Sequence, residues 1–507
     1  TWARENSLPC CCSPWESADS VGSVGMRQML SPCSCVKILR NERFKEGDVQ
    51  IWADQASDSE PVSEGKGSRY GDLDSAPHVL LPSGTGYEER HDLTLRSAAA
   101  NNKSCQSALD AMGHWNMDVM SFAALSEHEG HPLSAMLQCL FSEPRLPRRM
   151  QAHGLLGTLP AHTYRGSPEA LESRIFRYME NVEGAYLQLP YHSSKHAADT
   201  MSTMEYFLST PVMQSFCSTL DHIVCLIAAG VHDVGHPGRT NVFQVSTASK
   251  IALRYNDLSP LENMHAALSF EIMNRDEKCN WRSLLESNAG DGITNPKHPQ
   301  SRVRKMMLSM VLATDNAQHA KLMAKWTDLL EWQSLGKVTQ APLELRALKR
   351  PENEEKKQVL LDVVMHIADI SNPAKPLSIA LSWTRALLEE LWSQGDEEAM
   401  LGLPISPLCS RSVGVTSVPQ GQIDFIQFFA LPSYKSLSLA ISESQEAMKH
   451  LISNLAFWKV KLGEQATFEQ VFGQESQQKR EEEAGREGQP CLAAASLAWN
   501  PANAIQG

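Results

Sequence analysis

The fold of this chain is decided by an apolar run that ends in polar residues, Ile223-Val224-Cys225-Leu226-Ile227-Ala228-Ala229-Gly230-Val231-His232-Asp233-Val234-Gly235-His236-Pro237-Gly238. The apolar part predicts a buried helix, and it is too short to span a bilayer. Burying an ionised carboxylate is costly unless the carboxylate is paired or bound to a metal. His232 and Asp233 therefore indicate a polar site at a helix end. The alternative is a core histidine followed by an aspartate that caps the next turn.

Composition indicates a globular intracellular protein with a sizeable core. The chain has 507 residues, 42% of them hydrophobic, and a formal net charge of −13. This charge gives no general case for nucleic-acid binding, and we expect no nucleic acid as a partner. The 12 cysteines form no recognisable disulfide framework, which favours a reducing, cytoplasmic location. The sequence shows no run of apolar residues long enough for a transmembrane helix and no visible signal peptide.

Three regions of the chain differ in composition and in hydrophobic periodicity. Residues 1–104 are rich in Ser, Gly, Asp and Glu and lack sustained periodicity, so we predict a disordered N-terminal extension. Cys10, Cys11 and Cys12 would allow a membrane tether through palmitoylation, although an unmodified reduced cluster is the favoured interpretation. Residues 105–465 contain successive helical runs separated by turn signals, which predicts a compact, all-α, multi-helix bundle. Residues 466–507 predict a charged, mostly disordered tail.

Chemistry-bearing residues gather in four clusters, each at a predicted helix or helix end. They are His192 with His196, His232-Asp233 with His236, Glu262 with its neighbours, and His366-Ile367-Ala368-Asp369. The spacing of four between His192 and His196 predicts that they share one helical face.

This mixture of imidazole and carboxylate indicates a metal-dependent hydrolase. Imidazole and carboxylate together suit Zn, Mn or Fe, while carboxylate and water suit Mg. Two metals about 3.5–4 Å apart are a common apparatus for phosphoester hydrolysis. A histidine outside the metal shell would then protonate the leaving oxygen.

The ordered set of motifs between residues 105 and 462 resembles the catalytic domain of class I cyclic nucleotide phosphodiesterases, within the HD-type metal hydrolases. The matching segments are Tyr191-His192, His196-Ala197-Ala198-Asp199, His232-Asp233, His236-Pro237-Gly238, Tyr255-Asn256-Asp257, Leu261-Glu262-Asn263, Leu312-Ala313-Thr314-Asp315, Ala368-Asp369-Ile370-Ser371-Asn372-Pro373, Trp383-Thr384, Gly395-Asp396, Ile405-Ser406-Pro407 and Gln422-Ile423-Asp424-Phe425-Ile426.

The resemblance implies a role for each matching residue. His196, His232, Asp233 and Asp369 correspond to ligands of a tightly bound metal, usually zinc. Asp233 also corresponds to the bridge to a second metal, usually magnesium or manganese. His192 corresponds to the general acid. Residues that orient water around the metals correspond to His236, Glu262 and Asp315. The nucleotide-binding residues correspond to Tyr191, Asn372, Gln422, Phe425 and Leu387, with the last two as walls of an apolar clamp around the base.

The implied activity is hydrolysis of a 3′,5′-cyclic nucleotide to the 5′-monophosphate by a metal-bridging hydroxide, which ends a cyclic nucleotide signal. Cyclic AMP and cyclic GMP both stay open as substrates, because the subfamily cues conflict, and a homodimer stays open as well.

Several residues depart from the family pattern. Gly235 replaces a common acidic residue, Met264 replaces a common histidine, and Asp424 replaces a common glycine. Because the residues matching the metal ligands and the general acid are intact, we expect an active enzyme. One alternative is a weak or inactive relative that only binds nucleotide. Another is an HD-type phosphohydrolase with a different phosphoester substrate.

Overall fold

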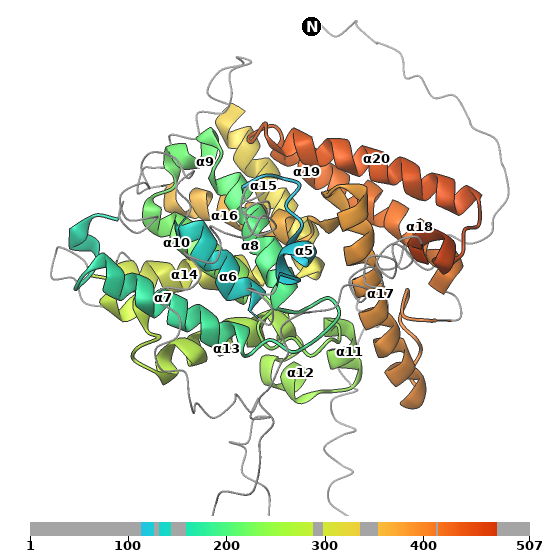
Figure 1. The fold of residues 1–507 in the computed structure, drawn as a ribbon, viewed down its shortest axis with the longest axis horizontal. Coiled ribbons are helices and arrows are strands. Elements are labelled where there is room, and N and C mark those ends of the chain that lie inside the picture. The colour runs from blue at the N-terminus through green and yellow to red at the C-terminus, as the bar shows by residue number, and fades with distance from the viewer. Residues whose placement is uncertain are drawn as a thin grey trace, which may run out of the picture. The chain divides into compact units, whose positions relative to one another are not determined.

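The computed structural model describes residues 113–125, 131–142, 159–286, 298–334, 353–411 and 414–473 (Figure 1). Within these ranges the structure contains helices and no strand, apart from one isolated antiparallel bridge between Tyr164 and Leu285. The all-α fold predicted from the sequence is therefore confirmed. The predicted extension 1–104, with Cys10, Cys11 and Cys12, lies outside the described residues. Within the predicted tail, Ala466 and Phe472 are buried.

The first half of the described chain supplies the helices that carry three of the four polar clusters. These helices are α5 (Val119–Ala123), α6 (Pro132–Ser142), η3 (Ala161–Thr163), α7 (Pro168–Glu183), α8 (Ser194–Leu208), α9 (Pro211–Phe216), α10 (Thr219–Val231), α11 (Asn241–Ser246), α12 (Lys250–Tyr255), α13 (Pro260–Arg275) and η4 (Trp281–Leu284).

The second half supplies the remaining helices. They are α14 (Pro299–Leu312), η5 (Asn316–Gln318), α15 (His319–Ser334), α16 (Glu354–Asp369), η8 (Asn372–Ala374), α17 (Leu377–Met400), α18 (Gly414–Phe425), the π-helix η9 (Ile426–Ala430), α19 (Leu431–Leu437) and α20 (Ser444–Gly463). None of the described helices is long and apolar enough to cross a membrane.

Helix α10 is the buried helix that the apolar run predicts. It begins with a capping box, in which the Ser218 side chain accepts from the Asp221 N–H and the Asp221 carboxylate accepts from the Ser218 N–H. Residues 220–231 are all buried, because α10 packs against α8, α14 and α16. Figure 1 shows α8, α10 and α16 close together in the middle of the helical layers. Because of this packing, His232, at the C-cap of α10, lies in the interior.

Helix α6 is capped by a residue from another helix. The Glu183 carboxylate, from the last residue of α7, accepts from the backbone N–H groups of Leu133 and Ser134 at 2.8 and 2.9 Å. It also accepts from the Ser134 hydroxyl at 2.5 Å. A carboxylate at a helix N-terminus satisfies free N–H groups and complements the helix dipole. Glu183 therefore joins α7 to the start of α6.

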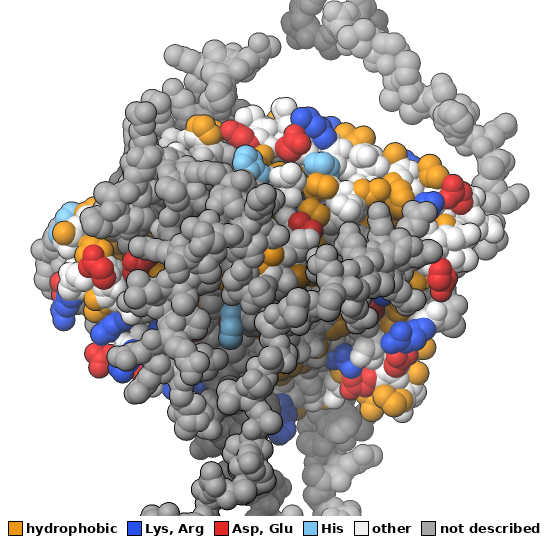
Figure 2. Space-filling view, viewed as in Figure 1, with side chains coloured by type: hydrophobic (Ala, Val, Ile, Leu, Met, Phe, Trp, Pro, Cys, Tyr) orange, Lys and Arg blue, Asp and Glu red, His pale blue; other side chains and the backbone are white. Residues whose placement is uncertain are grey.

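The helices α17 to α20 lie together on one side of the view in Figure 1. Helix α20 packs against α17, α18 and α19. On the face shown in Figure 2, acidic and basic side chains are interspersed with hydrophobic ones. Helix α17 forms ion pairs with residues outside it, because Glu397 pairs with Arg239 and Asp396 pairs with Arg411.

Candidate active site

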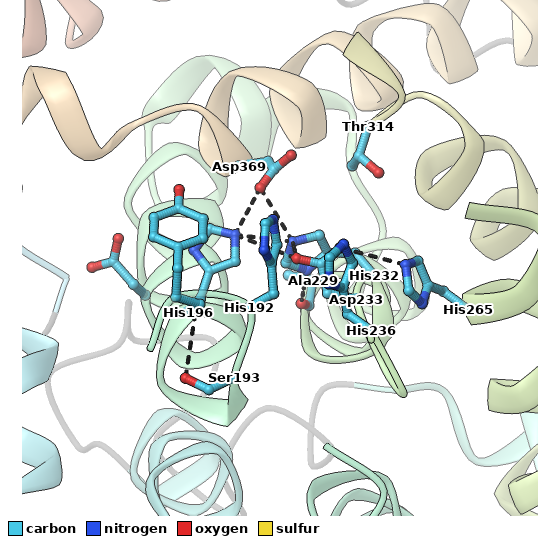
Figure 3. Close-up of polar contacts among 12 residues, drawn as sticks. His192, Ser193, His196, Ala229, His232, Asp233, His236, His265, Thr314 and Asp369 are labelled. Carbon is cyan, nitrogen blue, oxygen red and sulfur yellow. Dashed lines mark hydrogen bonds and ion pairs between the residues drawn. The ribbon is translucent and has the colours of Figure 1, made fainter. Parts of the chain in front are cut away.

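Four residues predicted as metal ligands come together at the start of one helix and at the ends of two others. His196 lies in the first turn of α8, His232 and Asp233 follow α10, and Asp369 is the last residue of α16. One ligand atom from each residue lies within 4.8 Å of all the others (Figure 3). The Nε2 atoms of His196 and His232 lie 2.9 and 3.2 Å from Asp369 Oδ1. These residues thus form a group able to hold a metal ion.

The donor set of this group fits a divalent transition metal. His232 donates from Nδ1 to the carbonyl of Ala229 at 2.8 Å, which turns its Nε2 toward the group. The Nε2 atoms of His196 and His232 are 3.3 Å apart, and both imidazoles are buried. Burial lowers the pKa of His232, but Asp233 and Asp369 outweigh it and raise the pKa well above its ordinary value. Two imidazole nitrogens with two carboxylates are typical ligands for zinc.

The predicted general acid, His192, does not share a helical face with His196, so that prediction was wrong. Helix α8 begins at Ser194, and His192 lies in the turn before it. The backbone N–H groups of Tyr191 and His192 instead donate to Glu390 Oε2, each at 3.1 Å. A carboxylate from α17 therefore holds the turn that precedes α8.

The same carboxylate also holds the imidazole of His192. Nδ1 of His192 contacts Oε1 of Glu390, so Nε2 is free to face a ligand. Burial lowers the pKa of His192, but the charge and hydrogen bond of Glu390 reverse this effect and raise the pKa. For Glu390, burial raises the pKa, and His192 with the two backbone N–H groups lowers it below its usual range. The pair therefore favours a protonated imidazole.

His236 lies against the other side of this imidazole. The rings of His192 and His236 stack with centroids 3.8 Å apart and an interplanar angle of 18°. His236 Nδ1 accepts from the Gly238 N–H at 3.0 Å. Burial and the neighbouring His192 hold the pKa of His236 well below its usual value. A neutral His236 with its Nδ1 as acceptor carries its proton on Nε2.

The predicted acidic residues around the metal group lie on α13 and before η5. Both oxygens of Glu262 contact Asn241 Nδ2, at 3.1 and 2.9 Å. Burial and the charge of Asp315 raise the pKa of Glu262 to about 7. Asp315 accepts from the Ser259 hydroxyl at 2.6 Å and from the Ala317 N–H at 2.9 Å. Their role in orienting water stays a prediction.

The two departures beside Asp233 have different structural settings. Gly235 has φ +76°, and a Cβ built there would lie 2.6 Å from Leu268 Cδ2. The backbone and packing at this position therefore suit glycine. Next to Met264, His265 donates from Nδ1 to Val234 O at 2.8 Å, and its Nε2 lies 3.7 Å from Asp233 Oδ1. The histidine that remains thus reaches the metal group.

Two of the predicted nucleotide-binding residues touch each other. The Tyr191 hydroxyl donates to Asn372 Oδ1 at 2.5 Å, and Asn372 Nδ2 donates to Asp199 Oδ2 at 2.9 Å. The Tyr191 ring lies against His196, with centroids 4.6 Å apart. Tyr191 and Asn372 thereby border the metal group.

The predicted apolar clamp comes from α17 and α18. Leu387 is half-buried and lies three residues before Glu390, on the same face of α17. Gln422 and Phe425 are half-buried and three residues apart in α18, directly before the π-helix η9. Phe425 stacks with Phe429, which in turn stacks on His319. Contact of these residues with a base stays a prediction.

Sequence reasoning missed several polar residues of this site, above all Glu390 and Asp199. Glu390 follows Glu389 on an amphipathic helix, where a charge is typical of a solvated surface. The signal that could have identified Glu390 was its spacing of three residues from Leu387. This spacing places Glu390 on the helix face that carries a residue predicted to contact the base. Asp199 was quoted as part of a motif but received no role.

Comparisons with known proteins agree with this fold. Residues 191–451 match the family model described as 3′5′-cyclic nucleotide phosphodiesterase. The chain is 32% identical over 357 residues to 3′,5′-cyclic-AMP phosphodiesterase 4C of Mus musculus, covering 70% of this chain and 46% of that protein. It is also 32% identical over 296 residues to the human high affinity cAMP-specific and IBMX-insensitive 3′,5′-cyclic phosphodiesterase 8A, covering 57% of this chain and 34% of that protein. The chain spans about half the length of the curated relatives, or less.

A solved structure supports the same assignment. The crystal structure of the phosphodiesterase domain of Salpingoeca rosetta rhodopsin phosphodiesterase aligns with a TM-score of 0.52 and 26% identity, covering 73% of this chain and 99% of that one. The helical fold is thus that of a phosphodiesterase catalytic domain. The chain belongs to the 3′,5′-cyclic nucleotide phosphodiesterase family.

Proposed function

We propose that this protein hydrolyses a 3′,5′-cyclic nucleotide to the 5′-monophosphate with the help of two divalent metal ions. The observation that carries the proposal is the convergence of His196, His232, Asp233 and Asp369 next to the His192–Glu390 pair. Membership of the phosphodiesterase family favours this substrate class over another phosphoester.

The proposed tight site would hold zinc through His196, His232, Asp233 and Asp369. Asp233 has a second oxygen, Oδ1, on the side of His265, and it would reach a second metal, magnesium or manganese. Metals bound there polarise phosphoryl oxygens and lower the pKa of a coordinated water.

The side chains around the metals would donate the proton to the leaving group and form hydrogen bonds around the phosphate. A protonated His192 would give its Nε2 proton to the leaving O3′, since Glu390 engages its Nδ1. The ring of His236 stacks on the ring of His192, so the Nε2–H of His236 would donate a hydrogen bond to a water next to His192. Glu262, hydrogen-bonded to Asn241, would stay partly protonated near neutral pH, since its pKa is about 7.

The base would be held away from the metals by residues of α17 and α18. Leu387 and Phe425 would form the two walls of the clamp, while Gln422 and Asn372 would hydrogen-bond the base edge. The names of the two curated relatives support cyclic AMP as the first substrate to test. Cyclic GMP is the alternative substrate. Either nucleotide would be an intracellular substrate, in keeping with the predicted cytoplasmic location.

The deciding experiment compares cyclic AMP and cyclic GMP hydrolysis, with Mg²⁺ or Mn²⁺ added, for the wild type and Asp369→Ala. We expect the wild type to convert at least one nucleotide and Asp369→Ala to lose more than about 100-fold in kcat, because a metal ligand is removed. His450→Ala, on α20, is the control and should keep full activity. If the wild type converts neither nucleotide with metal supplied, the inactive nucleotide-binding relative becomes the better reading.

A further inference from the structure

Two histidines outside the metal group meet in a direct hydrogen bond. His319 is the first residue of α15, and its Nδ1 lies 2.8 Å from Nε2 of His366, on α16. His366 is 0% exposed, so this bond ties the ring of His319 to the core. Burial lowers the pKa of both imidazoles, to about 4 for His319, and the bond therefore joins two neutral rings near neutral pH.

The His319 ring packs on an aromatic side chain of η9. The rings of His319 and Phe429 stack with centroids 4.2 Å apart and an interplanar angle of 26°. The Phe429 ring in turn stacks with the Phe425 ring, with centroids 5.5 Å apart and an interplanar angle of 14°. Near-parallel rings at these separations attract each other. The three rings therefore form one continuous aromatic row, which ends at a predicted wall of the base clamp.

The backbone after Phe425 brings Phe429 into this row. Phe425 immediately precedes the π-helix η9, in which backbone hydrogen bonds join residues five apart. Within η9, Phe428 is 59% exposed, whereas Phe429 is half-buried against His319. Single π turns next to α-helices occur often at functional sites. The two adjacent phenylalanines thus have different surroundings, and the second one joins the aromatic row.

The Phe425 ring depends on such support because the core does not enclose it. The side chain is half-buried, and a ring that is free to change rotamer loses entropy when a ligand orders it. Contact with Phe429 limits the orientations of this ring before a base arrives, and Phe429 is limited in the same way by His319. A wall that is already ordered binds its ligand at a smaller entropic cost.

We propose that His319 is a positioning residue for base recognition, whose ring holds Phe429 and through it the plane of the Phe425 ring. His366 anchors this aromatic row in the core. The inference rests on the proposed function, because that function assigns Phe425 to the base. Its effect falls on binding of the base rather than on the metal group, since no member of the row is a predicted metal ligand.

The test separates the stacking ring of His319 from its hydrogen bond. His319→Gln keeps a hydrogen-bonding group and removes the ring. It should raise KM for the hydrolysed nucleotide about 3- to 10-fold, the worth of one aromatic pair, with kcat changed less than about 2-fold. His319→Phe keeps the ring and removes the bond, so its KM should stay within about 2-fold of the wild type. It should nevertheless lower the melting temperature, because the buried Nε2 of His366 loses its partner.

Further measurements assign the effect to the aromatic row. Phe429→Ala should raise KM by a similar factor, and adding His319→Gln to it should change KM by no more than about 2-fold, since both act through Phe425. Phe428→Ala is the matched control, because this neighbouring ring is exposed, and it should leave KM unchanged. Ribose 5-phosphate, the product without its base, should inhibit all variants with the same constant, and bound zinc should be the same in all of them.

Distinct outcomes overturn the inference and the proposed function. If His319→Gln keeps the wild-type KM, or if His319→Phe raises KM as much as His319→Gln does, the stacked ring does not position the clamp and the inference is wrong. It is also wrong if the effects of Phe429→Ala and His319→Gln multiply, or if the variants weaken inhibition by ribose 5-phosphate as strongly as they raise KM. If the wild type neither hydrolyses nor binds cyclic AMP or cyclic GMP, as measured by calorimetry, the proposed function fails and the inference falls with it.

Discussion

The imidazole of His192 is held by the carboxylate of Glu390, a residue 198 positions further along the chain. The carboxylate also accepts from the backbone N–H groups of Tyr191 and His192, which hold it beside the ring. The contact fixes the tautomer of His192 and raises its pKa. It links the turn before α8 to α17, the helix that also carries Leu387.

We predict that Glu390→Gln lowers kcat about 10- to 100-fold, because a neutral amide stabilises the imidazolium of His192 less well than a carboxylate does. A proton donor works only while it is protonated, so activity falls as pH rises through the pKa of His192. Removing the charge of Glu390 lowers that pKa, and the alkaline limb of the pH–rate profile should move to lower pH. The neighbouring Glu389→Gln, which breaks only an exposed pair with Arg385, should leave the profile in place.

Metal retention should depend on the four converging ligands. Purified wild type should hold about one equivalent of zinc, and His232→Ala should lose it. Free zinc at about 100 times its Kd should stabilise the wild type by about 3 kcal/mol, because the metal binds only the folded state. Thermal unfolding after chelation and after zinc addition measures this effect. A His232→Ala protein that is stabilised by zinc as much as the wild type would contradict the ligand assignment.

Gly235 should not tolerate a side chain. Gly235→Ala should destabilise the protein by about 1–3 kcal/mol, because φ is +76° and the Cβ would meet Leu268. Gly402→Ala is the matched control, since Gly402 has φ +69° with nothing within 4 Å of its Cβ position. It reports the backbone cost alone, about 1–2 kcal/mol. Chemical denaturation of both variants should therefore show the larger loss for Gly235→Ala. Equal losses would mean that Leu268 moves aside without cost.

Asp362, on α16, should make stability depend on pH. Burial raises its pKa to about 6, although Gln358 and the Ser309 hydroxyl donate to it at 2.7 Å each. Because the folded pKa lies above the unfolded value, stability falls as pH rises from about 4 to about 6 and then stays level. Asp362→Asn should thus stabilise the protein by about 1–3 kcal/mol at pH 8 and by much less at pH 4.5. A gain that is equal at both pH values would rule out this origin.

The helices were predictable from the sequence because their signals are local, and the apolar run before His232 indicates α10. The meeting of His196, Asp233 and Asp369, at the ends of three separate helices, was implied only by the resemblance to the phosphodiesterase family. The His192–Glu390 contact was not predictable in this way, since it depends on how two distant helices cross. Helix α8 also begins later than the His192–His196 spacing indicates, because the backbone is extended at its N-cap, Ser193. The same limit applies to the hydrogen bond between Asp199 and Asn372, which are 173 residues apart.

The cap that Glu183 places on α6 has a consequence for how the chain is made. Leu133 and Glu183 are 50 residues apart, so the ribosome releases α6 before the residue that completes its first turn. An isolated helix of 11 residues is marginal in water. Helix α6 therefore gains its N-terminal cap only once α7 has been synthesised and has docked against it.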